Sequence, residues 1–255
     1  MEKVTLRWSA LLNKLFIVKD LEQRDNLLDN ILRPDGYPKT IAFLNAYAMM
    51  ISLRDNEFFK RLSGATYLLR DGIGVKYLLS SIGLDSGLNL NGSDLIPEII
   101  SLIPKESRVA LMGTNDMALD LVNEKLSIDG FSNVTTLDGF RDDEDYLNHV
   151  QENNPTLVVL GMGMPKQERV AELIASKFPD RDLVILFGGG ILDFLSGLKK
   201  RAPLPIRKYN LEWLYRFSKE PRRMWARNIE SFIFIVYTKM YAKRIRKLVS
   251  KVQID

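Results

Sequence analysis

Residues 156–197 read TLVVLGMGMPKQERVAELIASKFPDRDLVILFGGGILDFLSG, and this stretch contains the clearest structural signal in the chain. Two short runs within it, Leu157–Leu160 and Leu183–Phe187, are continuously apolar and lead into glycines. Such runs are typical of strands that are covered on both faces. The residues from Pro165 onward have helical spacing, and proline suits the first turn of a helix. The stretch therefore predicts a strand–helix–strand unit of a parallel sheet.

The same alternation of apolar runs and helical segments begins upstream, at about Thr40. It predicts an α/β fold with a mostly parallel sheet, and a chain of 255 residues is long enough for one large domain of this class. We expect further strands at 40–46, 67–71, 108–113 and 134–140, and helices at 49–62, 72–83, 114–126 and from 142, with Thr114 or Asn115 as the N-cap of the third.

The character of the chain changes after Gly197, where the alternation ends. A basic, proline-containing linker (199–210) precedes a helical pattern (211–220), and a proline then separates this pattern from a last segment. We expect a core over residues 1–197 and a basic, membrane-associating appendage over residues 198–255.

The charges of the chain are distributed unevenly. Its net charge is +4, but residues 199–255 hold 16 Lys and Arg against 4 Asp and Glu, whereas the rest holds 20 against 28. An asymmetry of this size indicates that the C-terminal part meets an anionic surface or ligand. Phosphate groups, acidic lipid headgroups and nucleic acid are the candidates.

Composition also excludes several kinds of site. The chain has no cysteine, so disulfides, thiol nucleophiles and cysteine-based zinc sites are excluded. Its single histidine, His149, stands in a polar stretch and is expected on a helix surface, so catalysis should rest on carboxylates. We expect no signal peptide, because Asn13 and Lys14 interrupt the N-terminal apolar patch. Since no apolar run reaches the roughly 20 residues that span a bilayer, we expect a cytoplasmic protein.

Polar or glycine-rich residues stand at the ends of several predicted strands. Because parallel strands place their carboxyl ends at one edge of the sheet, these residues predict a nucleotide cleft there. No P-loop motif is present and no full G-x-G-x-x-G follows a strand, so a P-loop ATPase or an ordinary dehydrogenase is not expected. The strand-end residues are Asn45, Asp71–Gly74, Gly113–Asn115, Gly161–Gly163 and Gly188–Gly190.

Acidic residues offer two candidate sites, each with an alternative. Asp71 closes a strand and precedes glycines, so it could be a general base or a turn residue that caps the next helix. Asp143 and Asp145 form a D-x-D that could hold a metal, but acidic residues also favour the start of a helix, which is the stronger interpretation. Lys166, Gln167 and Glu168 lie on the first turn of the helix after Gly163, a position that suits a phosphate or base contact, and a solvated helix face is the alternative.

The segment 229–252 combines an apolar cluster (232–237) with six basic residues. An interfacial helix that turns its basic residues toward acidic headgroups fits this pattern. The alternative is a helix packed on the core or at a subunit contact.

An ordered set of motifs spans about Thr40 to Arg227. They are LNA (44–46), DGIGV (71–75), NGSDL (91–95), LGMGMPKQE (160–168), FGGGILDFLSG (187–197), KRAP (200–203) and LEWLYRFSKEPRR (211–223). Together they resemble the WecG/TagA/CpsF family of bacterial glycosyltransferases. The resemblance implies a Rossmann-like fold of the type called GT-E, with a C-terminal appendage.

The resemblance also implies an activity. Proteins of this kind transfer a sugar, with inversion, from a UDP-sugar to a polyprenyl-diphosphate-linked saccharide at the cytoplasmic face of the membrane. The products are cell-surface polysaccharides of the exopolysaccharide, capsule, teichoic acid or enterobacterial-antigen type. No cofactor or metal is expected, and a homo-oligomer is compatible with the sequence.

Residue roles are implied by the same motifs. Asp71 corresponds to the proposed general base, and the appendage arginines Arg216, Arg222 and Arg223 correspond to residues that act on the leaving group. Two departures, Phe43 where Thr is frequent and Asn89 where Arg is frequent, leave the identity of the sugar open. With the strand-end glycines, the expected substrate-binding residues are Asn45, Gly72, Gly113, Gly161, Gly163, Lys166, Gln167, Gly188, Gly189 and Asp193.

Two alternatives are weighed against an inverting transferase. A nucleic-acid-binding protein would use the basic C-terminus but would leave the glycine-rich strand ends without a purpose. A non-catalytic nucleotide-binding partner of another transferase would not need Asp71 or the arginine motif.

Overall fold

The computed structural model describes residues 2–208 and 212–249, without the side chains of 208, 216, 223, 224 and 226–228. In this part of the chain seven strands form one sheet, in the order β1-β3-β2-β7-β6-β4-β5, and every neighbouring pair is parallel. The predicted Rossmann-like α/β fold is thus confirmed. The strands are β1 (Leu15–Phe16), β2 (Pro38–Leu44), β3 (Tyr67–Arg70), β4 (Val109–Gly113), β5 (Val134–Leu137), β6 (Leu157–Gly161) and β7 (Leu183–Phe187).

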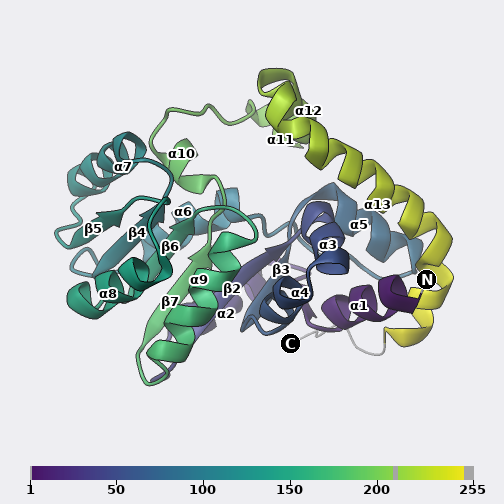
Figure 1. Cartoon of the computed structure of the whole chain (residues 1–255), viewed down its shortest axis with the longest axis horizontal. Coiled ribbons are helices and arrows are strands. Elements are labelled where there is room, and N and C mark those ends of the chain that lie inside the picture. The colour runs from purple at the N-terminus through teal and green to yellow at the C-terminus, as the bar shows by residue number, and fades with distance from the viewer. Residues whose placement is uncertain (1, 209–211, 250–255) are drawn as a thin grey trace.

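Helices cover both faces of this sheet (Figure 1). Successive residues of a strand point to opposite faces, so Val158 and Leu160 enter one apolar cluster while Leu157 and Val159 enter the other. This explains why the central strands are continuously apolar. The first cluster is completed by α1 (Glu2–Asn13), α3 (Ala46–Arg54), α4 (Asn56–Ser63), α5 (Gly72–Ser81), α8 (Asp143–Asn153), α9 (Lys166–Lys177) and α13 (Pro221–Leu248), and the second by α2 (Leu21–Leu32), α6 (Gly92–Leu102), α7 (Asp116–Ile128) and α10 (Ile191–Leu195).

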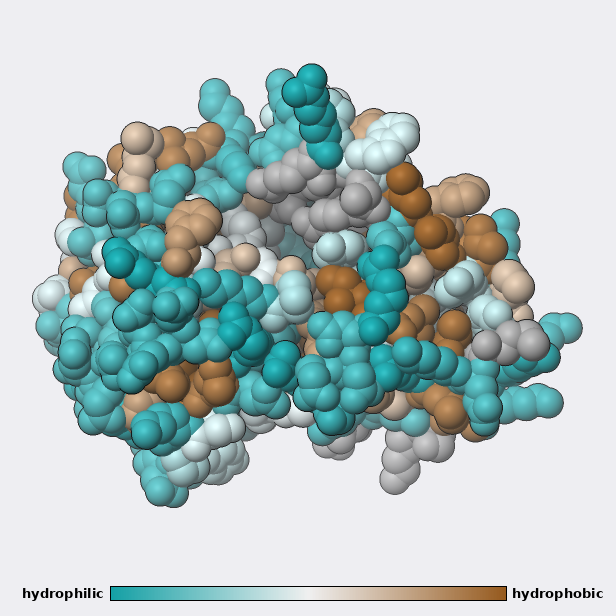
Figure 2. All heavy atoms as spheres, in the orientation of Figure 1, coloured by the Kyte–Doolittle hydropathy of each residue, from teal (hydrophilic) through white to brown (hydrophobic). Residues whose placement is uncertain are grey.

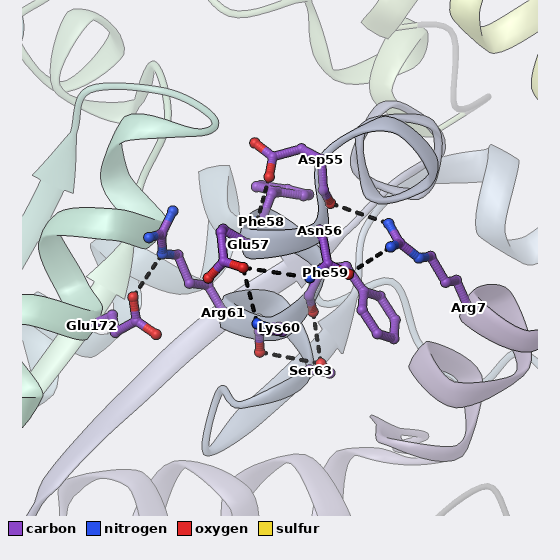
Figure 3. Close-up of polar contacts among 10 residues, drawn as sticks. All are labelled: Arg7, Asp55, Asn56, Glu57, Phe58, Phe59, Lys60, Arg61, Ser63 and Glu172. Atoms are coloured by element: carbon purple, nitrogen blue, oxygen red, sulfur yellow. Dashed lines mark hydrogen bonds and ion pairs between the residues drawn. The ribbon is translucent and has the colours of Figure 1, made fainter. Parts of the chain in front are cut away.

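One predicted helix, over residues 49–62, is wrong, because the structure has two helices there, α3 and α4. Asp55 separates them: its extended backbone ends α3, and its side chain accepts a hydrogen bond from Phe58 N (2.9 Å) as the N-cap of α4. Figure 3 shows Arg7, which comes from α1, reaching this junction, where it donates to the Asn56 side chain at 2.6 Å. The apolar spacing continues across the break, so the capping residue was the only local signal of it.

The basic C-terminal region forms α11 (Leu204–Lys208), α12 (Glu212–Lys219) and the long α13. α13 packs against α1, α3 and α5. Its Phe234 is fully buried, with its ring centre 4.9 Å from that of Trp8. A Cβ at Gly74 would lie 2.8 Å from Ala46 Cβ and 3.5 Å from the Phe234 ring, so α3, α5 and α13 meet at a glycine.

The opposite side of α13 is exposed and carries apolar residues, which Figure 2 shows as brown spheres among hydrophilic ones along the upper right of the molecule. Residues 229–252 were expected either to contact the membrane or to pack on the core. One side of α13 packs on the core, and membrane contact stays a prediction for the exposed side. In the described residues, no helix is sufficiently long and apolar to cross a bilayer. The exposed apolar residues of α13 are Trp225, Ile229, Phe232, Ile235, Val236, Met240 and Leu248.

Candidate active site

The carboxyl ends of the strands bring the predicted polar and glycine residues to one edge of the sheet. Asn45 follows β2, Asp71 follows β3, Gly113 ends β4, Gly161 ends β6 and Gly188 follows β7. After α10 the chain passes above this edge to α11 and α12, at the top of Figure 1. The edge is therefore the place where backbone N–H groups and helix starts can meet a ligand.

Asp71 stands between β3 and α5 with a half-buried side chain. Its backbone N–H donates to Leu44 O at 2.9 Å, which joins its position to the end of β2. Asp71 occupies the N-cap position of α5, yet its carboxylate makes no capping hydrogen bond. Its Oδ2 instead accepts from Asn45 Nδ2 at 3.4 Å. The interpretation of Asp71 as a capping residue therefore does not describe its carboxylate, which faces Asn45 at the end of the neighbouring strand β2.

Asn89 fixes the turn that carries this carboxylate. Its Oδ1 accepts hydrogen bonds from Gly72 N (2.8 Å) and from Arg70 Nη1 (3.4 Å). Arg70 is buried, and it donates further to Ser86 O (2.7 Å) and Gly87 O (3.1 Å). Burial lowers the pKa of the Arg70 guanidinium, and the adjacent carboxylates act in the opposite direction. A buried cation thus lies beside the candidate base.

Three of the predicted glycines are required for close packing. A Cβ at Gly113 would lie 2.4 Å from the carbonyl carbon of Gly161, and one at Gly161 would lie 2.6 Å from Leu192 Cδ1. A Cβ at Gly188 would lie 2.4 Å from Ile191 Cγ2. These glycines allow β4, β6 and α10 to approach each other at the edge. Beyond Gly189, whose φ is +58°, the space is open.

Gln167 and Glu168, in the first turn of α9, lie beneath the turn formed by Gly188–Gly190. Both side chains are 1% exposed. Gln167 Oε1 accepts from Gly189 N at 2.9 Å, and its Nε2 donates to Glu168 Oε1 at 2.9 Å. The amide of Gln167 is therefore engaged inside the protein and supports the glycine turn.

Residues 17–248 match the glycosyl transferase WecG/TagA/CpsF family. The chain belongs to this family. It is therefore a glycosyltransferase.

Two curated relatives carry the same name, N-acetylglucosaminyldiphosphoundecaprenol N-acetyl-beta-D-mannosaminyltransferase. The protein of Bacillus subtilis (strain 168) is 30% identical over 194 residues, which is 73% of each chain. That of Staphylococcus aureus (strain MW2) is 26% identical over 192 residues, or 73% of this chain and 74% of the relative.

Other predicted site residues of this WecG/TagA/CpsF glycosyltransferase hold neighbouring loops together. Lys166 Nζ donates to Gly139 O and Arg141 O, both at 2.9 Å, and joins α9 to the loop before α8. Asp193 accepts from the Thr114 hydroxyl and forms an ion pair with Lys199 at 2.6 Å. These contacts join the ends of β4 and β7 to the start of the basic region.

The basic region is attached to α6 through Asp94. Arg201 Nη1 lies 2.6 Å from Asp94 Oδ1, and its Nη2 lies 3.4 Å from Glu212. Arg207 also reaches Asp94, at 3.5 Å. Burial would raise the pKa of Asp94, but the hydrogen bonds from Arg201 and Asn91 outweigh it and hold the pKa below its usual value. The NGSDL and KRAP motifs therefore meet in one ion-pair network.

The appendage arginines are described in part. Arg222 is exposed in the first turn of α13. Arg216 and Arg223 belong to α12 and α13, but their side chains lie outside the described part of the structure. Their role at the leaving group stays a prediction.

The D-x-D sequence marks the start of a helix, as its stronger interpretation predicted. Asp142 and Asp145 form the capping box of α8, and Asp143 pairs with Arg169. Among the described residues no group of His, Cys, Asp and Glu is arranged to hold a metal. His149 lies on α8 as expected, but it is half-buried and bonded to the Thr135 hydroxyl at 3.0 Å. Burial lowers its pKa.

The sequence did not indicate the part that two residues play at the site. Asn89 was read as a departure from the family pattern, whereas it supports the turn at Gly72. Asp94 was not singled out as a site residue, although it forms an ion pair with Arg201 of the basic region. Thr114 was expected among the strand-end residues, and its hydroxyl donates to Asp193. The pairing of Asp94 with the basic region did have a signal in the sequence, because the NGSDL motif carries a negative charge and the KRAP motif carries positive charges.

Proposed function

We propose that this glycosyltransferase moves a sugar from a UDP-sugar to a polyprenyl-diphosphate-linked saccharide, with inversion and with Asp71 as the general base. The proposal rests above all on one observation, the carboxylate of Asp71 at the carboxyl edge, which does not cap its helix. The names of the relatives support an acceptor of this class, because the B. subtilis and S. aureus proteins are named for N-acetylglucosaminyldiphosphoundecaprenol.

In this mechanism Asp71 takes the proton of the acceptor hydroxyl as its oxygen attacks the anomeric carbon. The bond from that carbon to the UDP oxygen breaks at the same time, and its electron pair leaves with the diphosphate. Asn45 holds Asp71 Oδ2, and Asn89 holds the turn at Gly72, so the carboxylate is oriented before the acceptor binds.

The departing UDP carries a negative charge that must be stabilised. Backbone N–H groups at the strand ends and the appendage arginines, of which Arg222 is exposed, would supply this stabilisation without a metal. A basic region that passes over the carboxyl edge supports this assignment, and so does its attachment to α6 through Asp94.

The membrane contact proposed for α13 fits the same acceptor. Its outward side combines apolar residues such as Phe232 with the exposed Lys239 and Lys243. A helix of this kind lies in the headgroup region of an anionic bilayer. This placement would bring the carboxyl edge to a substrate that is itself anchored in the membrane.

The decisive experiment compares Asp71→Asn with Asp116→Asn. Asp116 is an exposed carboxylate in the first turn of α7, at the same edge of the sheet, and serves as the matched control. UDP release is measured with a panel of UDP-sugars and a short-chain polyprenyl-diphosphate N-acetylglucosamine, and UDP affinity by calorimetry. We expect Asp71→Asn to lower kcat by about 10²- to 10⁴-fold with nearly unchanged UDP affinity. Full activity of this variant would remove Asp71 as the base.

The membrane contact has its own test. Phe232→Glu should reduce co-sedimentation with vesicles that contain phosphatidylglycerol while leaving turnover of the short-chain acceptor unchanged. Equal co-sedimentation of the variant and the parent protein would exclude this side of α13 as the contact.

A further inference from the structure

Glu168 is a buried carboxyl group that the proposed mechanism does not use. It lies in the first turn of α9, it is 1% exposed, and burial raises its pKa to about 7. Its Oε1 accepts from Gln167 Nε2, while its buried Oε2 has no partner among the described residues. A carboxyl group with this pKa changes its charge within the physiological pH range.

Few charges offset this carboxyl group. Arg61 of α4 faces it and acts to lower its pKa, but Arg61 is itself paired with Glu172, one turn further along α9 (Figure 3). On the side of α8, Asp143 and Arg169 pair with each other. Burial therefore determines the ionisation of Glu168.

A chain of two hydrogen bonds connects Glu168 to the carboxyl edge. Glu168 Oε1 fixes the amide of Gln167, because only the NH₂ group of that amide can donate to it. The amide oxygen is then directed at Gly189 N, 2.9 Å away. Glu168 thus selects the amide orientation that supports the glycine turn.

We propose that Glu168 is a positioning residue for the turn Gly188–Gly190 and that it takes up a proton when a nucleoside diphosphate binds at this turn. This inference rests on the proposed UDP-sugar donor. A diphosphate bound at the turn, beyond these two hydrogen bonds, disfavours the ionised carboxylate, because like charges in a poorly solvated site repel each other. The neutral carboxyl still offers its Oε1 to Gln167, so the turn keeps its shape while the charge is removed.

Binding and protonation are then linked. If the bound diphosphate raises the pKa of Glu168 by about one unit, UDP binding weakens by about seven-fold as the pH rises from 6 to 8.5. Near pH 7.5 the same shift corresponds to an uptake of about half a proton per UDP bound.

The test is calorimetry of UDP binding to the full-length protein, at several pH values and in two buffers of different ionisation enthalpy. Glu168→Gln keeps the acceptor for Gln167 but cannot ionise. UDP binding to Glu168→Gln should therefore lack the pH dependence and the proton uptake that come from Glu168. UDP and His149 titrate in the same way in the parent protein and in Glu168→Gln, so their contribution cancels when the two pH profiles are subtracted. Glu144→Gln, which removes an exposed carboxyl group from α8, should behave like the parent protein.

The role in positioning has a separate readout. Glu168→Ala removes the acceptor and should weaken UDP binding at every pH, whereas Glu168→Gln restores it. Identical pH dependence and proton uptake in the parent protein and Glu168→Gln would refute the coupling. Equal UDP affinity of Glu168→Ala and Glu168→Gln would refute the positioning role. Absence of UDP binding to the parent protein at any pH would instead refute the proposed donor, and the inference with it.

Discussion

Glu168→Gln should change the stability of the ligand-free protein in a way that depends on pH. The pKa of Glu168 is about 7 in the folded protein, against an ordinary value of 4.5. Between these values the folded protein holds a proton that the unfolded chain has lost, so stability falls as the pH rises from about 4.5 to about 7. A difference of about 2.5 units corresponds to about 3 kcal/mol. The loss is complete above pH 7, where the folded protein contains a buried carboxylate.

Glutamine carries no charge at any pH and should remove this loss. The free energy of unfolding of Glu168→Gln, relative to the parent protein, should therefore increase by about 2–3 kcal/mol between pH 5 and pH 8. Urea unfolding at pH 5, 6.5 and 8, followed by tryptophan fluorescence and far-UV circular dichroism, measures this difference. Parallel stability curves for the two proteins would show that Glu168 ionises normally and would refute the reasoning from burial. Glu144→Gln, as an exposed control, should give parallel curves.

Three further variants test other parts of the structure. Phe234→Ala should lower the free energy of unfolding by about 3–5 kcal/mol, because it leaves a cavity under α13, and a loss below 1 kcal/mol in urea unfolding would contradict the packing. Asn89→Ala removes the acceptor for Gly72 N–H and should lower kcat by about ten-fold or more with little change in stability, whereas unchanged kcat would exclude a positioning role. Asp94→Asn should speed trypsin cleavage within residues 198–208 while changing the stability by less than about 1 kcal/mol, and an unchanged cleavage rate would show that the ion pair with Arg201 does not hold this segment.

Much of the fold could be predicted from the sequence, because its central elements carry strong local signals. Strands covered on both faces are continuously apolar, as Leu157–Leu160 shows, and the glycines after them end each run. The N-cap of α7 was narrowed to two residues, and Asn115 is the one that accepts from Ala118 N. Because the strands are parallel, their carboxyl ends all lie at one edge of the sheet, so this edge could be predicted as well.

Features that depend on distant partners could not be predicted in this way. Asp94 and Arg201 are 107 positions apart, and neither segment alone shows that they pair. The hydrogen bond from Gly189 N to the amide of Gln167, in the first turn of α9, joins positions that are 22 apart, and neither segment alone shows it. The division at Asp55 was missed because the apolar spacing continues from α3 into α4.

The meeting of Ala46, Gly74 and Phe234 has a mechanical consequence. The first turn of α5, which begins directly after Asp71, is clamped between α3 and the C-terminal helix with no room for even a methyl group. Any side chain at position 74 would therefore have to displace α3 or α5, and Asp71 stands directly before α5.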